Sequence, residues 1–112
     1  MNGKEAEQAA ADFLTSRGLT LTDKNYRCRF GEIDLVMRDG KVLVFVEVRM
    51  RASEKFGGAA ASITAGKQAK LIRTAQHYLA DLKTAPACRF DAVLLSGAKG
   101  DKIEWIKNAF GE

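Results

Sequence analysis

Residues 31–51 read GEIDLVMRDGKVLVFVEVRMR, and this stretch decides the fold. It starts with alternating polar and apolar residues and is almost wholly apolar from Val42 to Val48, and the pair Asp39-Gly40 separates the two halves. Alternation is typical of a half-buried strand, a continuous apolar run of a strand buried on both faces, and Asp-Gly of a tight hairpin turn. We therefore predict an antiparallel hairpin whose second strand lies in the centre of a sheet.

Further elements are predicted on both sides of the hairpin. Apolar residues at helical spacing predict two helices, and weaker extended patterns predict three more strands. The helices are expected over 3–17 and 64–83, and the strands over 19–28, 89–95 and 102–107. Residues 53–62 and 97–101 are predicted to be loops. The order helix, three strands, helix, two strands predicts an α/β fold with a central mixed sheet flanked by helices.

The composition is that of a folded domain with a small positive charge. The chain has 112 residues, with 18 Lys and Arg against 14 Asp and Glu, so its formal charge is +4. We expect a single domain over 1–112. No apolar run approaches the roughly 20 residues of a membrane helix, and the N-terminal sequence MNGKEAEQAAADFL carries acids where a signal peptide is basic and then apolar. We expect a cytoplasmic protein that does not bind membranes.

The register of the hairpin brings acidic side chains together. If Asp39-Gly40 is the two-residue loop, Arg38 pairs with Lys41, and Glu32 then faces Glu47 across the strands. Because side chains alternate between faces, Asp34 lies on the same face as these two glutamates. A loop longer by one residue would turn one strand over and separate the acids.

Carboxylates that meet on a partly buried face repel one another. Three arrangements relieve this repulsion: protonation of one acid, an ion-pair network with Arg49 and Arg38, or a hard divalent cation such as Mg²⁺ between the oxygens. Spacing alone leaves all three open.

The same residues resemble a known enzyme superfamily. GEIDLV at 31–36 followed by FVEVR at 45–49 is similar to the core of PD-(D/E)xK nucleases, in which an aspartate precedes a Glu-x-Lys tripeptide on the adjacent strand. More closely, NYRCRFGEIDLVMRDGKVLVFVEVRMR, the Phe56-Gly57 pair, and the later segments RFDAV and IKNAF resemble the uncharacterised bacterial YraN-like family. The resemblance implies a restriction-endonuclease-like fold related to Holliday-junction resolvases, and a metal-dependent nuclease acting on DNA, with a homodimer as a candidate state.

The resemblance also implies roles for individual acids. Asp34 matches the motif aspartate and Glu47 the glutamate of the tripeptide, so both are expected to bind Mg²⁺ or Mn²⁺ together with the backbone carbonyl of Val48. Glu7, on the first helix, matches the acidic residue that several such nucleases place near the metal. Glu32 belongs to the GEID pattern of the family, which assigns it no role.

Arg49 occupies the position of the motif lysine. An arginine can hold a phosphate or stabilise developing negative charge, but a guanidinium keeps its proton in proteins and therefore cannot act as a base. Glu7 and Glu32 are then the remaining candidates for a base among these side chains. Gln68 lies in the apolar sector of the second helix, where its amide could reach the acids or cap a nearby backbone group.

Basic residues follow the acidic segment in the sequence and suit contacts with a phosphate backbone. These are Arg51, Lys55, Lys67, Lys70 and Arg73. Together with the acids they favour a Mg²⁺-dependent nuclease. A non-catalytic nucleic-acid-binding module derived from a nuclease, and a structural or assembly protein, are the alternatives.

Overall fold

The computed structural model describes residues 1–50, 63–97 and 101–111, and these form two helices and five strands. The helices are α1 (Gly3–Ser16) and α2 (Ala65–Ala80). The strands are β1 (Thr20–Cys28), β2 (Gly31–Asp39), β3 (Val42–Met50), β4 (Cys88–Ser96) and β5 (Lys102–Phe110). The element order predicted from the sequence is confirmed. The loop predicted over 53–62 lies outside the described residues.

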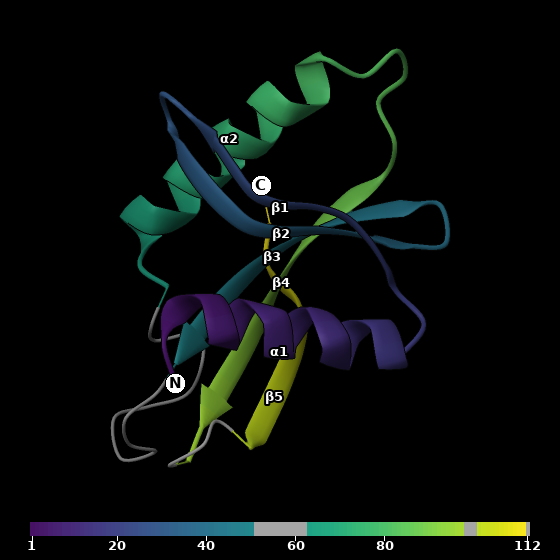
Figure 1. Ribbon diagram of the computed structural model, residues 1–112. Helices are drawn as coiled ribbons and strands as arrows, with labels where there is room; N and C mark the ends of the chain where they lie inside the picture. Colours follow the sequence, from purple (N-terminus) through teal and green to yellow (C-terminus); the bar gives the residue numbers. More distant parts are fainter. Residues whose placement is uncertain (51–62, 98–100, 112) are drawn as a thin grey trace.

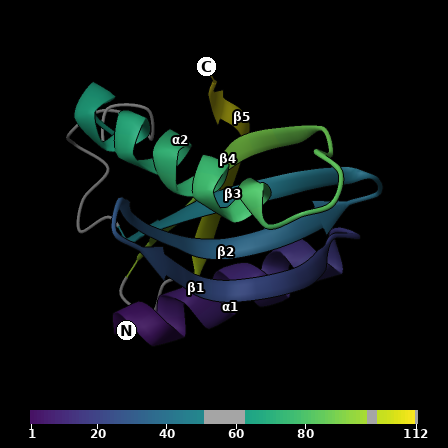
Figure 2. The same ribbon diagram turned by 90° about the horizontal axis from the view of Figure 1, so that it is seen from above.

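The strands form one mixed sheet in the order β1-β2-β3-β4-β5. All neighbours are antiparallel except β3 and β4, which are parallel and connected through α2. A parallel pair needs such a crossover, because the chain must return to the end at which the first strand began. Helix α1 covers one face of the sheet and α2 the other (Figures 1 and 2). This mixed α/β fold agrees with the expected nuclease-like architecture, and β3 is its central strand.

The hairpin register differs from the predicted one by two residues. Asp39 pairs with Val42, and the pairing of β2 with β3 continues to Leu35 with Val46. The two-residue loop is therefore Gly40-Lys41, with Gly40 at φ +61° as in a type II′ turn. Glu32 consequently does not face Glu47, and its partner in the sheet is Arg27 of β1.

A shift of two residues preserves which side chains share a face. Phe45 and Val36 pack in the hydrophobic cluster on the α2 side, whereas Val44 and Val46 pack in the cluster on the α1 side. The predicted division of β3 into two apolar faces is confirmed.

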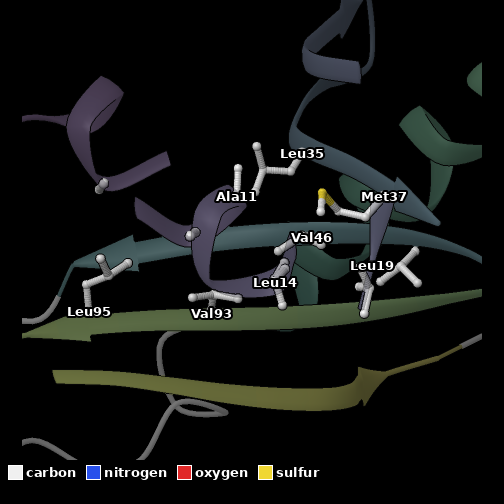
Figure 3. Close-up of a cluster of buried hydrophobic side chains, with 11 residues drawn as sticks. Ala11, Leu14, Leu19, Leu35, Met37, Val46, Val93 and Leu95 are labelled. Carbon is white, nitrogen blue, oxygen red and sulfur yellow. The ribbon is translucent and has the colours of Figure 1, made fainter. Parts of the chain in front are cut away.

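Helix α1 begins with a capping box and packs its small apolar face on β3 and β4. Asn2 accepts from the Glu5 N–H, and Glu5 accepts from the Asn2 N–H, which satisfies two backbone donors at the start of the helix. Leu14 is fully buried and points toward Val46 and Val93 of the sheet (Figure 3). Helix α1 is thereby fixed on one face, so the N-terminal turns that carry Glu7 have a defined position.

A buried aspartate joins β4 to the edge strand β5. Asp91 is 0% exposed and accepts from the guanidinium of Arg89, the indole N–H of Trp105 at 2.9 Å and the backbone N–H of Asn108 at 2.9 Å. Arg89 also reaches Asp39 at 2.9 Å, which ties the end of β2 to β4. Asp91 thus supports the sheet, a role that its sequence position alone does not reveal.

We expect Asp91→Ala to lower the free energy of unfolding by about 3–5 kcal/mol, because three partly buried donors, on Arg89, Trp105 and the Asn108 backbone, lose their shared buried acceptor. Urea denaturation measures this change. The control is Asp12→Ala, which removes an exposed acid on α1 and should change stability by no more than about 0.5 kcal/mol. Equal stabilities of the two variants would contradict the structural role of Asp91.

Candidate active site

Asp34 lies where β2 and β3 cease to pair as a ladder. The pairs end at Leu35 and Val46, and beyond them the Asp34 carboxylate, through Oδ2, accepts from the backbone N–H of Val48 at 2.8 Å. The alternation of β2 is irregular here, since Ile33 packs on the α2 side while Leu35 packs on the α1 side. The side chain of Asp34 therefore takes the place of a strand-to-strand hydrogen bond. In a strand the N–H and C=O of one residue point to the same edge, so the carbonyl of Val48 faces β2 as well.

Glu47 is a buried acid near the end of β3. Its side chain is 7% exposed, and its Oε1 lies 2.9 Å from the ammonium of Lys67 on α2. Arg49 approaches the same oxygen with Nε at 3.6 Å, which is beyond hydrogen-bond distance, and this buried nitrogen has no hydrogen-bond acceptor among the described residues. Among the described residues, Lys67 of the crossover helix α2 is therefore the basic side chain nearest to the Glu47 carboxylate.

The two acids open into one cavity of about 210 Å³ between the sheet and α2. Acidic side chains come from the sheet and basic ones from the helix. The lining residues are Gly31, Glu32, Asp34, Glu47, Lys67, Lys70, Leu71 and Thr74. A water occupies about 30 Å³ in the liquid, so the cavity has room for several waters or for a phosphate group.

Burial and neighbouring charge raise the pKa of Asp34 from its ordinary value of 3.8 to about 7. Removal from water has the largest effect, and the negative charge of Glu47 adds to it. The hydrogen bond from the Val48 N–H opposes both, because it stabilises the ionised carboxylate. A carboxyl group in this state attracts cations, since a positive charge nearby would relieve the cost of ionisation.

Glu7 and Glu32 lie near Asp34 and Glu47, but neither of them faces another acid across paired strands. Both are near enough to Asp34 to raise its pKa. Glu7 is half-buried on α1, and Glu32 is an exposed residue that lines the cavity and forms a 2.9 Å ion pair with Arg27. The structure thus brings four acids into one region from three elements, with Asp34 and Glu47 closest to its centre.

The other residues singled out in the sequence divide into three groups. The amide of Gln68 donates to the backbone carbonyl of Ile63 at 3.0 Å, and Gln68 does not line the cavity, so it caps the backbone. Lys70 and Arg73 are exposed on α2, and Lys70 also lines the cavity. Arg51 and Lys55 lie outside the described residues.

The acidic side chains of the cavity suit Mg²⁺ or Mn²⁺, which keep bound waters, better than a metal ion whose ligands all come from the protein. The described part of the chain holds no group of three or more His, Cys, Asp or Glu side chains arranged around a common point. Mg²⁺ binds proteins through one or two carboxylates and fills its other positions with waters and phosphate oxygens. Asp34, Glu47 and a cavity with room for several waters meet that requirement.

Lys67 is the site residue whose place the sequence did not reveal. Its position in the run of basic residues suggested contact with nucleic acid, whereas its ammonium forms an ion pair with Glu47. The available signal was helical phase, because Lys67, Leu71 and Thr74 share one face of α2. Thr64 begins the helix by accepting from the Lys67 N–H at 3.2 Å, which fixes Lys67 in the first turn.

Comparison with known proteins gives one consistent result. The model of the "Uncharacterised protein family UPF0102" matches residues 6–95. A UPF0102 protein of Nitrosomonas europaea is 66% identical over 110 residues, which are 98% of this chain and 93% of that protein. Relatives in Nitrosospira multiformis and Methylococcus capsulatus are 61% and 51% identical, and the matches cover 98% and 97% of this chain and 92% and 89% of theirs. In the described residues no helix is long and apolar enough to span a bilayer.

The raised pKa of Asp34 predicts an unusual dependence of stability on pH. The unfolded chain ionises this carboxyl near 3.8 and the metal-free folded chain near 7, so the folded state binds more protons between these values. The free energy of unfolding should therefore fall as pH rises from about 4 to about 7, by at most about 4 kcal/mol from this group. Asp34→Asn should remove this loss and be more stable than the parent at neutral pH.

Urea denaturation of both proteins across this pH range, with metal chelated, measures the effect. The amide oxygen of an asparagine can still accept from the Val48 N–H, so the variant isolates the charge. Stability curves that run parallel for parent and variant would show that Asp34 ionises normally.

Proposed function

This chain belongs to the uncharacterised protein family UPF0102, and we propose that it is a metal-dependent nuclease that hydrolyses phosphodiester bonds of DNA. One observation carries the proposal: two carboxylates from adjacent strands, Asp34 and Glu47, line the same cavity as the lysines of α2. Acids suited to a divalent cation and bases suited to a phosphate are both needed at a site of phosphodiester hydrolysis. The sequence resemblance to PD-(D/E)xK nucleases supports the same reading, because Asp34 and Glu47 are its motif acids.

Charged side chains in and around the cavity have parts in the proposed reaction. Asp34 and Glu47 would hold Mg²⁺ or Mn²⁺, together with the Val48 carbonyl, which lies on the β2 side of β3. When bound, such a cation supplies Lewis acidity toward a phosphate oxygen and makes water a better nucleophile at neutral pH. Lys70 on the cavity wall and Arg73 farther along α2 hold the phosphate backbone. Glu32 or Glu7 accepts the proton of the attacking water, because Arg49 stays protonated.

Branched DNA is the substrate we test first, because the resemblance extends to Holliday-junction resolvases. Such enzymes act as dimers, so we include a homodimer in the proposal, and sedimentation velocity with and without a four-way junction tests it. We also propose that the protein works in the cytoplasm, where it would meet such DNA.

A non-catalytic nucleic-acid-binding module is the second candidate. Arg49 in the lysine position favours it, together with the ion pair between Glu47 and Lys67. The two candidates differ in what divalent cations do. A nuclease cleaves in Mg²⁺ or Mn²⁺, whereas a module binds in a salt-sensitive way and leaves the strands intact. A structural protein does neither.

We expect the parent to cleave labelled branched, single-stranded or duplex DNA in the presence of Mg²⁺ or Mn²⁺ and to be inactive with a chelator. Asp34→Asn and Glu47→Gln should each lower the cleavage rate by roughly 100-fold or more, because several kcal/mol of transition-state stabilisation depend on the cation. Asp12→Asn, on the exposed side of α1, is the matched control and should cleave like the parent. RNA of the same sequence tests the choice of nucleic acid.

Calorimetry measures whether the parent and the two variants bind Mn²⁺. Cleavage that persists in Asp34→Asn and Glu47→Gln would refute this site, and an absence of cleavage with retained DNA binding would favour the module.

A further inference from the structure

Lys67 lines the cavity but lies outside the tripeptide motif at 47–49. In the tripeptide Glu47-Val48-Arg49, the third position carries a guanidinium, and its Nε stays 3.6 Å from the Glu47 carboxylate. Lys67 comes from a different element and reaches the same oxygen at 2.9 Å. Two basic groups thus converge on one buried acid, and the closer one is a lysine.

We propose that Lys67 of α2 is the catalytic lysine of this site, which donates hydrogen bonds to the attacking water and to an oxygen of the scissile phosphate in place of a lysine at position 49. This inference rests on the proposed nuclease function. It concerns which side chain supplies the ammonium group. An experiment can therefore contradict the role of Lys67 and leave the nuclease function intact.

The geometry of the helix favours this role. The Thr64 cap fixes the first turn of α2, and Leu71, one turn further on, is 5% exposed and packs in the core. The backbone that carries Lys67 is therefore held against the sheet, while its side chain is only 35% exposed and lines the cavity. A side chain with little freedom loses little entropy when it orients a water or a phosphate.

The chemistry of the two basic groups also differs. An ammonium is compact and has three donors that rotate, so it can hold a water and a phosphate oxygen beside a carboxylate. The guanidinium of Arg49 is planar, and the donors on its terminal nitrogens point along a fixed fork. Arg49 is thus suited to clamp the phosphate, while Lys67 is suited to position the nucleophile.

A lysine at position 49 should therefore be able to replace the ammonium group of Lys67. Arginine Nε occupies the place of lysine Cε along the side chain, so a lysine at position 49 would carry its ammonium one bond beyond a point that is 3.6 Å from Glu47 Oε1. That places it within reach of the same carboxylate oxygen.

The test is a rescue experiment with four proteins: the parent, Lys67→Met, Arg49→Lys, and the double variant Arg49→Lys/Lys67→Met. We expect Lys67→Met to lower kcat for DNA cleavage by roughly 100-fold with KM within about threefold of the parent. The double variant should regain at least about tenfold of the lost kcat. Lys83→Met, an exposed lysine beyond the end of α2, is the matched control and should cleave like the parent.

Circular dichroism and urea denaturation show whether each variant is folded before its rate is compared. A parent that cleaves in an Asp34-dependent way, with Lys67→Met unchanged or the folded double variant as slow as Lys67→Met, overturns the role of Lys67 and leaves the nuclease standing. A loss confined to KM would also overturn it, because Lys67 would then only hold the backbone. A parent that cleaves no nucleic acid overturns both proposals.

Discussion

The hydrogen bond from the Val48 N–H to the carboxylate of Asp34 is the constraint on which the site depends. It replaces a rung of the β2-β3 ladder and fixes an acidic side chain where two backbones would otherwise pair. The carboxylate is thereby drawn out of water and toward Glu47, which raises its pKa to about 7. Two carboxylates held close together in this way lower the stability of the fold, a cost that natural proteins commonly retain where a function requires it.

The crossover connection relieves that unfavourable charge. Strands β3 and β4 are parallel, so the chain must pass over the sheet between them, and α2 is the element that does so. The first turn of α2 lies over the acids and contributes Lys67, whose ammonium compensates Glu47. The same helix therefore completes the fold and balances the charge of the site.

A second buried acid shows how different the outcome is when hydrogen-bond donors surround it. Asp91 accepts from Arg89, Trp105 and the backbone of Asn108, so it is fully satisfied inside the protein. Within the described part of the chain, Asp34 accepts from one backbone donor and has an acidic neighbour, Glu47. Burial alone thus does not identify a candidate functional carboxylate. The hydrogen-bond donors and the negative charges around each carboxylate distinguish Asp34 from Asp91.

The sequence by itself determined the elements, the central place of β3 and the division of its side chains between two faces, because these follow from periodicity within one segment. It missed the hairpin register, since Gly40 takes the first loop position, yet the shift of two residues kept Asp34 and Glu47 on one side. Only the tertiary structure decided that Lys67 meets Glu47 and that Gln68 does not reach the acids. The position of a helix over a sheet depends on packing across the whole chain, which no local pattern encodes.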